Sequence, residues 1–471
     1  MIIAGWVEGY IANAVQTPAF VRITMKTIRQ LAADLASGRL TSVALTQDML
    51  ARAEAHRAHG GHAYVSLDGE QALKEARASD ALRAAGMVAS PLAGMPISIK
   101  DLFDVRGQVS SAASRVLADA PAASRDAVAV ARLRAAGAVL LGRTNMSEFA
   151  FSGLGLNPHH GTPRNPHDAS RVAGGSTSGG AVSVALDMAA GALGTDTGGS
   201  IRIPSAFCGL TGFKPTAASV PLAGTVPLSR SLDSAGAIAN SVDCCAILHA
   251  ALSGHAPAPP APSLKGLRFG YTADYVGANL EPQVRQAFER TLDMLGAAGA
   301  LVEQFDFPEL LQLSAINSGG GLVAAEAWHW HRDLLEQQGA QYDPRVAARI
   351  RRGQQQGAAE YLDLLDARAH LRAIASDRLA LFDAWLMPSV AIVAPQVAPL
   401  EADDAAFFAT NGLVLRNASV INFLDGCDLS LPCQARGELP VGLSICGVHG
   451  MDERILAIAR AVEALLHAAS P

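Results

Sequence analysis

The pattern that most constrains this fold is a helix that stops at a glycine and passes directly into a short apolar strand. Asp126 is a good N-cap for a helix over 127–136, Gly137 ends that helix, and 138–141 has the composition of a buried strand. A second apolar strand is predicted over 94–100; it is entered through glycine and proline and ends at Lys100. Alternation of helices with buried strands predicts an α/β fold.

A single large α/β domain can account for the full length of the chain. Its 471 residues are 50% hydrophobic and 17% charged, which predicts a large buried core and not disorder. The clearest linker is the Pro/Ala-rich segment 255–263, and the residues from about 308 to 380 are expected to be mainly helical, as a lid or side layer. Residues 1–24 lack the basic start of a signal peptide, so we predict a loose N-terminal extension there and a domain over 25–471.

Charge and composition exclude several classes of partner. A net charge of −6 and only 5% aromatic residues argue against a nucleic-acid surface. No apolar run reaches the ~18 residues that a membrane span needs. The six cysteines are scattered without a CxxC pair, which is typical of core residues in a reducing compartment and predicts a cytoplasmic protein. No cofactor and no metal are expected, because His329 and His331 are two residues apart and face different sides of a helix.

Two Gly-rich segments, 174–180 and 196–202, resemble known catalytic loops only in part. Gly180 stands where a phosphate-binding loop carries its lysine, so that interpretation fails. No GxSxG motif surrounds Ser200, so the nucleophile elbow of the α/β-hydrolases is absent.

Ser200 is nevertheless a candidate nucleophile. Bare glycine lets the main chain approach a ligand closely, and the four N–H groups of this turn can point at a developing oxyanion; they belong to Thr197, Gly198, Gly199 and Ser200. A serine hydroxyl needs a base, and a buried Lys100 would have a lowered pKa. Ser176 could relay a proton between them. Taken singly, each feature has a simpler interpretation, because lysines at strand ends are usually solvated and Gly/Ser loops are usually turns.

Taken together, these segments resemble the amidase signature family. The resemblance is carried by MPISIKD (95–101), GGSTSGG (174–180) and TDTGGSIRIPSA (195–206), and continues through 142–149, 212–216 and 439–443. It covers nearly the whole chain from Met25. It implies a single compact α/β domain, in which a large mixed β-sheet is flanked by helices and a variable helical region, about 264–410, forms one side of the substrate pocket.

The resemblance also implies the roles of the residues. Ser200 attacks an amide carbonyl, and Ser176, placed by a cis peptide bond after Gly175, passes protons between Ser200 and neutral Lys100. Thr177 stands where many family members have a second serine. Apart from the resemblance, Asp196 and Arg202 have opposite charges and are expected to form an ion pair that supports the loop. The residues predicted to line the pocket are Met146, Phe149, Gly153, Trp328, Trp330 and Phe423, with Met387 as a further candidate; core packing is the competing interpretation.

The leading hypothesis is an enzyme that resembles stand-alone bacterial amidases and hydrolyses the C–N bond of small, fairly apolar amides. Aryl amides, carbamates and esters are included, since esters are easier acyl donors. The expected partner is a small-molecule amide, and the expected assembly is a monomer or homodimer. Two alternatives stay open at this point: the A subunit of an aminoacyl-tRNA amidotransferase, which would need a second chain, and a non-catalytic binding protein on the same scaffold.

Overall fold

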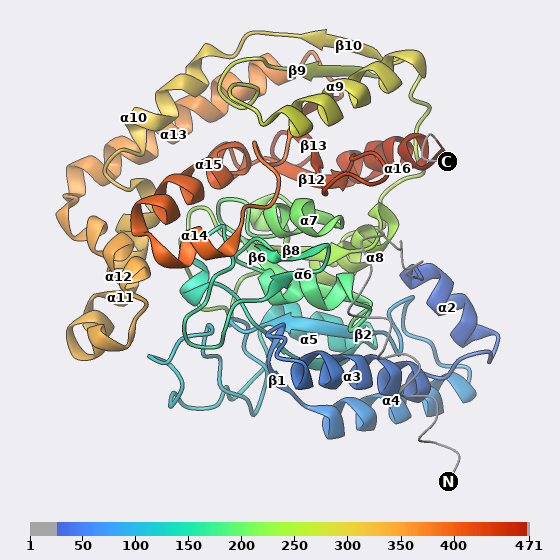
Figure 1. Cartoon of the computed structure of the whole chain (residues 1–471). Coiled ribbons are helices and arrows are strands. Elements are labelled where there is room, and N and C mark those ends of the chain that lie inside the picture. Colours follow the sequence, from blue (N-terminus) through green and yellow to red (C-terminus); the bar gives the residue numbers. More distant parts are fainter. Residues whose placement is uncertain (1–25, 469–471) are drawn as a thin grey trace.

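The computed structural model describes residues 26–468, and its core is one sheet of eleven strands (Figure 1). In order across the sheet, the strands are β1 (Tyr64–Leu67), β3 (Val139–Thr144), β2 (Pro96–Lys100), β6 (Gly191–Asp196), β8 (Ser234–Ala239), β7 (Thr211–Lys214), β12 (Cys427–Pro432), β13 (Gly442–Gly447), β11 (Ala384–Pro388), β9 (Arg268–Tyr271) and β10 (Leu301–Gln304). A separate two-stranded sheet pairs β4 (Arg164–Asn165) with β5 (Asp168–Val172). The predicted extension, 1–24, lies outside the described residues.

Parallel and antiparallel pairs alternate in blocks across this sheet. Strands β3, β2 and β6 are parallel to one another, the central strands from β6 to β11 pair antiparallel, and β11, β9 and β10 are again parallel. Every position of β2, β3, β6, β7, β8, β11 and β13 is buried, as expected for strands covered on both faces. The predicted single α/β domain with a large mixed sheet is confirmed.

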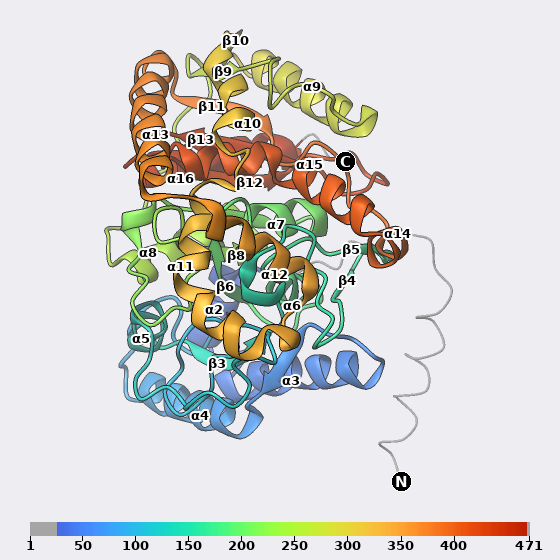
Figure 2. The same ribbon diagram turned by 90° about the vertical axis from the view of Figure 1, so that its left-hand side faces the viewer.

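Helices cover the sheet on both faces and along one flank. They are α2 (Ile28–Ala36), α3 (Ser42–Ala58), α4 (Gly69–Ala84), α5 (Val128–Ala135), α6 (Ser178–Ala185), α7 (Arg202–Cys208), α8 (Val242–Ser253), α9 (Pro282–Ala297), α10 (Leu313–Ile316), α11 (Gly321–Gln338), α12 (Pro344–Arg351), α13 (Ala358–Leu379), α14 (Val397–Ala402), α15 (Asp404–Phe423) and α16 (Asp452–Ala468). Figure 2 looks onto the flank formed by α10–α13 and shows α11 and α12 on the side of the sheet near β6 and β8. The side layer predicted over about 308–380 is therefore helical, as expected.

One helix start differs from its prediction. Asp126 does not cap α5, because Ala127 occupies the N-cap position and makes no side-chain capping bond. The Asp126 carboxylate instead accepts the Arg106 N–H at 2.7 Å and pairs with Arg134 at 3.1 Å. The Asp126 carboxylate therefore connects the loop that carries Arg106 to the helix, and does not cap the helix.

The cysteines and the length of the helices were both subjects of sequence predictions. All six cysteines are free thiols, and five of them are buried. No helix among residues 26–468 is both long enough and apolar enough to cross a membrane.

Candidate active site

The parallel register of β2 and β6 brings Lys100 to the centre of the site. Ile99 pairs with Leu193, so both strands end at the same edge of the sheet, where Lys100 meets Thr195. Lys100 is fully buried, and its Nζ donates to Ser176 Oγ at 2.8 Å and to Thr195 Oγ1 at 2.8 Å. The lysine predicted from the strand pattern and the serine predicted as its relay are therefore in direct contact.

Burial controls the protonation of this lysine. Desolvation lowers the pKa of Lys100 to about 7, although the carboxylates of Asp196 and Asp233 act in the opposite direction. A substantial fraction of Lys100 is thus neutral near neutral pH, and a neutral amine can accept a proton.

Ser176 is held by a loop that only glycine backbone can form. The peptide bond between Gly175 and Ser176 is cis, as the family resemblance implied. The Gly175 N–H donates to Gly153 O at 2.8 Å, and a Cβ on Gly175 would lie 2.6 Å from the Gly155 nitrogen. Gly153 therefore supports the catalytic loop from behind.

Ser200 lies on the turn between β6 and α7 and faces a cavity. It is 3% exposed and belongs to the cavity wall. Its carbonyl accepts the Thr177 N–H at 3.2 Å, which ties the two Gly-rich segments together. Its hydroxyl makes no hydrogen bond to any part of the chain between 26 and 468, so Ser176 and Ser200 are not hydrogen-bonded in this state.

The predicted oxyanion hole needs one correction. Within the described chain, the N–H groups of Thr197, Gly198 and Ser200 have no acceptor. The Gly199 N–H is already occupied, because it donates to Asp196 Oδ1 at 2.8 Å. Gly199 has φ +123°, a conformation that side chains rarely adopt, so its role here is to shape the turn.

Asp196 and Arg202 form the predicted ion pair at the centre of a buried network. Both side chains are fully buried, and Arg202 Nη2 lies 2.8 Å from Asp196 Oδ1. Burial by itself raises the pKa of Asp196, but the guanidinium of Arg202 outweighs it and holds that pKa well below the usual value. Arg202 also binds Asp428 and Asn422, each at 2.6 Å. Sequence reasoning missed these last two, since no local pattern marks residues more than two hundred positions away.

Thr177 accommodates its extra methyl beside two glycines. Its Oγ1 donates to Thr195 O at 3.4 Å. A Cβ on Gly180 or on Gly194 would lie 2.8 Å from the Thr177 Cγ2 atom. The missing side chains of these glycines therefore make the space that the methyl fills.

The cavity beside Ser200 has a volume of about 660 Å³. Among the predicted lining residues, only Phe423 belongs to its wall as described. Met146 is fully buried, and Phe149 stacks on Tyr342 with 5.3 Å between ring centroids, while Trp330 packs on Phe149.

The pocket prediction is therefore corrected for Met146, Phe149, Gly153, Trp328 and Trp330, which are absent from this wall. Met387 is also a core residue, 1% exposed. Packing against neighbouring aromatic and backbone groups explains these positions better than substrate contact does.

The wall comes mainly from residues that sequence reasoning did not single out. They lie in the segments 150–152, 228–232, 313–324, 349–352 and 412–423, and include Tyr275. Their only shared sequence signal is that many of them fall in the region 264–410, which the family resemblance assigned to the pocket side.

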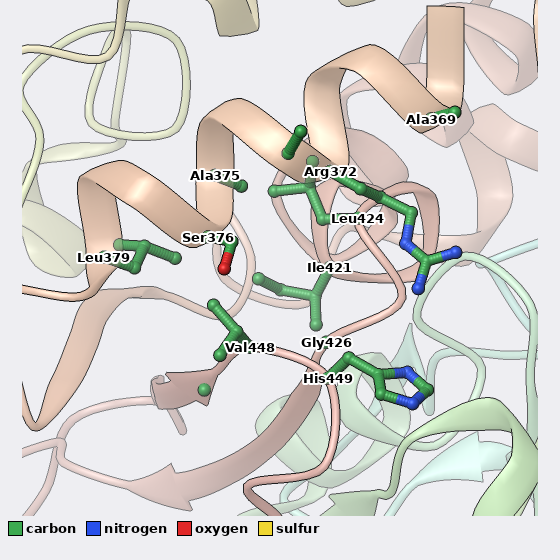
Figure 3. A pocket seen from close by; sticks show the side chains of 12 residues that line it. Ala369, Arg372, Ala375, Ser376, Leu379, Ile421, Leu424, Gly426, Val448 and His449 are labelled. Atoms are coloured by element: carbon green, nitrogen blue, oxygen red, sulfur yellow. The ribbon is translucent and has the colours of Figure 1, made fainter. Parts of the chain in front are cut away.

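A second cavity, of about 360 Å³, lies between α13 and the β12–β13 end of the sheet (Figure 3). Arg372 and His449 lie at one end of it and Leu379 at the other. Both polar groups already bind Asp425, at 3.1 and 3.0 Å, and none of the three catalytic candidates lines this cavity. It therefore offers no reactive group of its own.

One group of side chains is spaced for a cation, away from Ser200. The ligand atoms of His249, His255 and Glu453 lie within 4.8 Å of one another, on α8, just after it and on α16. His255 already pairs with Glu453 at 3.2 Å. His331 belongs to the core instead: its ring is hydrogen-bonded to the Tyr342 hydroxyl at 2.9 Å, and burial lowers its pKa to about 3.

Comparison with known proteins gives a consistent answer. The family model described as Amidase matches residues 44–456. The 2-amino-5-chloromuconic acid deaminase of Comamonas testosteroni is 35% identical over 451 residues, covering 93% of this chain and 96% of that protein. The A subunit of the Glutamyl-tRNA(Gln) amidotransferase of Moorella thermoacetica is 33% identical over 437 residues, covering 85% of this chain and 88% of that one.

A solved structure agrees with these relatives. The crystal structure of an amidase superposes with a TM-score of 0.85 at 35% identity, covering 93% of this chain and 99% of the other. The buried Lys–Ser pair, the two Gly-rich loops and these matches lead to one assignment: the chain belongs to the Amidase family of amide-hydrolysing enzymes.

Proposed function

We propose that this enzyme hydrolyses the C–N bond of small amides through an acyl-enzyme on Ser200. The observation that carries the proposal is the contact of 2.8 Å between Lys100 Nζ and Ser176 Oγ, in a buried site where the pKa of Lys100 is about 7. A base in this protonation state can activate a serine hydroxyl near neutral pH.

The first half of the reaction forms the acyl-enzyme. Ser200 Oγ bonds to the amide carbon, its proton passes to Ser176, and the Ser176 proton passes to neutral Lys100. The oxyanion that develops accepts hydrogen bonds from the free N–H groups of Gly198 and Ser200, with Thr197 as a further donor. The C–N bond then breaks, and the proton returns through Ser176 to the leaving amine.

Water completes the reaction through the same groups. It adds to the acyl carbon while Ser176 and Lys100 take its proton, and the proton returns to Ser200 Oγ as the acid departs. Because the Ser200 hydroxyl has no hydrogen-bond partner between residues 26 and 468, we propose that substrate binding brings this hydroxyl towards Ser176.

The residues that line the cavity support the proposal that the substrate has a small acyl group with an apolar body. Its apolar members are mostly aliphatic: Leu228, Leu232, Leu313, Val323, Leu413 and Leu415, together with Phe151 and Phe423. A volume of about 660 Å³ is in the usual range for small-molecule sites. Carbamates and esters are proposed as further acyl donors. A cytoplasmic location and a monomeric or homodimeric assembly stay predictions.

A second candidate function is the A subunit of a tRNA-dependent amidotransferase. It is favoured by the 33% identity to such a protein over 437 residues. It differs from the first in needing another chain, so purification from the native host with a tagged chain separates them: a stoichiometric second chain would favour the amidotransferase. A non-catalytic binding protein is disfavoured, because Lys100 contacts Ser176 in a buried site and Ser200 lines the cavity nearby.

The decisive experiment compares the wild type with Ser200→Ala. Amine release is followed on a panel of alkyl amides, aryl amides, carbamates and esters, and both proteins are treated with a fluorophosphonate probe. We expect turnover and labelling in the wild type and neither in the variant. Equal turnover in the variant, or labelling at another serine, would remove Ser200 from the mechanism.

A further inference from the structure

The wall of the active-site cavity carries three guanidinium groups and no carboxylate. Arg349, Arg352 and Arg416 line it, and no Asp or Glu between residues 26 and 468 does. Arg349 lies in the last turn of α12, Arg352 directly follows that helix, and Arg416 lies on α15. A cavity lined by positive charges and no negative ones favours ligands that carry a negative charge.

Arg349 is the most enclosed of the three. Its guanidinium carbon lies 4.2 Å from the centre of the Phe151 ring, and its Nη1 donates to Phe151 O. Burial, with a further contribution from Arg352, lowers the pKa of Arg349 to about 10, so the group is still cationic at neutral pH. Its other nitrogens have no partner in the described chain and remain available to a ligand.

No acidic side chain between residues 26 and 468 pairs with these three arginines. Arg352 donates to Ser318 O, and Arg416 donates to Asn417 Oδ1 at 2.9 Å and to Val276 O at 3.4 Å; all are uncharged oxygens.

Arg345, on the same helix α12 but outside the cavity wall, is by contrast paired with Asp404 at 2.7 Å. The arginines of the cavity are therefore the ones left without a carboxylate among the described residues. Leaving a partly buried cation unpaired is costly unless a ligand supplies the anion.

We infer that the substrate carries a carboxylate remote from the scissile amide, and that Arg349 binds it. The planar guanidinium matches a carboxylate with two parallel hydrogen bonds. Arg352 and Arg416 increase the positive electrostatic potential at the same wall. The aliphatic side chains contact the methylene chain between the amide and the carboxylate of the substrate. This inference rests on the proposed function and adds to it the chemical class of the substrate: a small amide of an acidic, partly aliphatic acyl group.

A matched pair of substrates tests the inference. Hexanamide and adipamate share the amide and the chain, and differ in a terminal methyl against a terminal carboxylate. We expect the wild type to prefer adipamate. In Arg349→Gln, kcat/KM for adipamate should fall about 10–100-fold, mainly through KM, with a much smaller change for hexanamide. Arg349→Lys should recover part of the loss, because it restores the charge without the planar fork.

Arg351→Gln is the control. Arg351 is exposed on α12, does not line the cavity, and its substitution removes the same charge. It should leave both substrates unaffected. Preference of the wild type for hexanamide, or equal losses on both substrates in Arg349→Gln, would overturn the inference.

A binding measurement keeps this test separate from the proposed mechanism. Ser200→Ala protein is titrated with adipamate by calorimetry, with and without Arg349→Gln. Binding that depends on Arg349 supports the carboxylate site even if the wild type turns over neither amide. Absence of binding by Ser200→Ala protein, while a fluorophosphonate still labels Ser200 in the wild type, would reject the carboxylate site and leave the Ser200 mechanism standing.

Discussion

The floor and the wall of the active-site cavity are built in different ways. The floor consists of Lys100 at the end of β2, Ser176 in the Gly-rich loop before α6, and Ser200 on the turn after β6; Lys100 and Ser176 are fully buried and Ser200 is 3% exposed. The wall comes mainly from the segments 313–324, 349–352 and 412–423, in which Arg352 is exposed and Arg416 half-buried. In the proposed mechanism the floor has the groups that break the bond, and the wall has the groups that select the substrate. Changes in the floor should therefore affect every substrate, and changes in the wall should affect some more than others.

The largest effect is expected at the centre of the floor. Ser200→Ala should lower kcat by at least ~10³-fold on every amide and ester, because the acyl-enzyme can no longer form. The fold should survive, since the substitution keeps the carbonyl that accepts the Thr177 N–H. Steady-state kinetics and a thermal melt measure both. A substrate on which the variant keeps wild-type kcat would break the distinction between floor and wall.

The pH dependence of the floor should follow Lys100. Its pKa of about 7 means that kcat/KM should fall about tenfold per pH unit below that value, as the amine becomes protonated and ceases to act as a base. The same limb should appear for neutral and for acidic substrates. If the pH at which kcat/KM falls differs between neutral and acidic substrates, the titrating group lies in the wall or in the substrate.

Stability should depend on the same lysine and should also decrease as the pH falls, but over a higher pH range than activity. The folded-state pKa lies below the usual value, so between about pH 7 and pH 10 the unfolded chain binds more protons at this residue. Its burial therefore costs stability that increases as the pH falls through this range. Lys100→Met should be inactive, and its Tm relative to the wild type should be higher at pH 7 than at pH 10. A constant difference would indicate that Lys100 has an ordinary pKa.

A substitution in the apolar part of the wall should act selectively. Leu232→Ala enlarges the cavity, and loss of the contact should reduce kcat/KM for short amides by roughly tenfold while longer or branched amides lose less. A panel of amides of increasing length measures this. Equal losses of kcat/KM across the panel would show that Leu232 affects every substrate, as we expect of the floor residues.

The smallest effect is expected behind the floor. Thr177→Ser removes only the methyl that packs against Gly180 and Gly194, which should cost about 1 kcal/mol of unfolding free energy. The hydroxyl that donates to Thr195 O is kept, so kcat should change by less than about threefold. Denaturant unfolding with kinetics on the same samples checks this. A large drop in kcat would give Thr177 a direct role in the chemistry.

Local patterns in the sequence, taken together as a resemblance to a family, were sufficient to name the candidate reacting groups. Lys100 follows from an apolar strand that ends in a lysine, and Ser176 and Ser200 follow from two glycine-rich turns whose spacing resembles a family. The alternation of strands and helices around them predicted an α/β fold, and the family resemblance added the large mixed sheet. The prediction of an Asp126 cap was wrong because the loop that carries Arg106 competed for its carboxylate.

Only the tertiary structure decided what surrounds those groups. Asp428 and Asn422 reach Arg202 from the far end of the chain, and Asp196 takes the Gly199 N–H away from the oxyanion hole. Arg349 and Phe423 meet at the cavity, whereas Trp330 turns into the core. The reason is physical: backbone turns and strand ends depend on neighbours within a few residues, while a cavity wall depends on how distant helices pack, which no local pattern records.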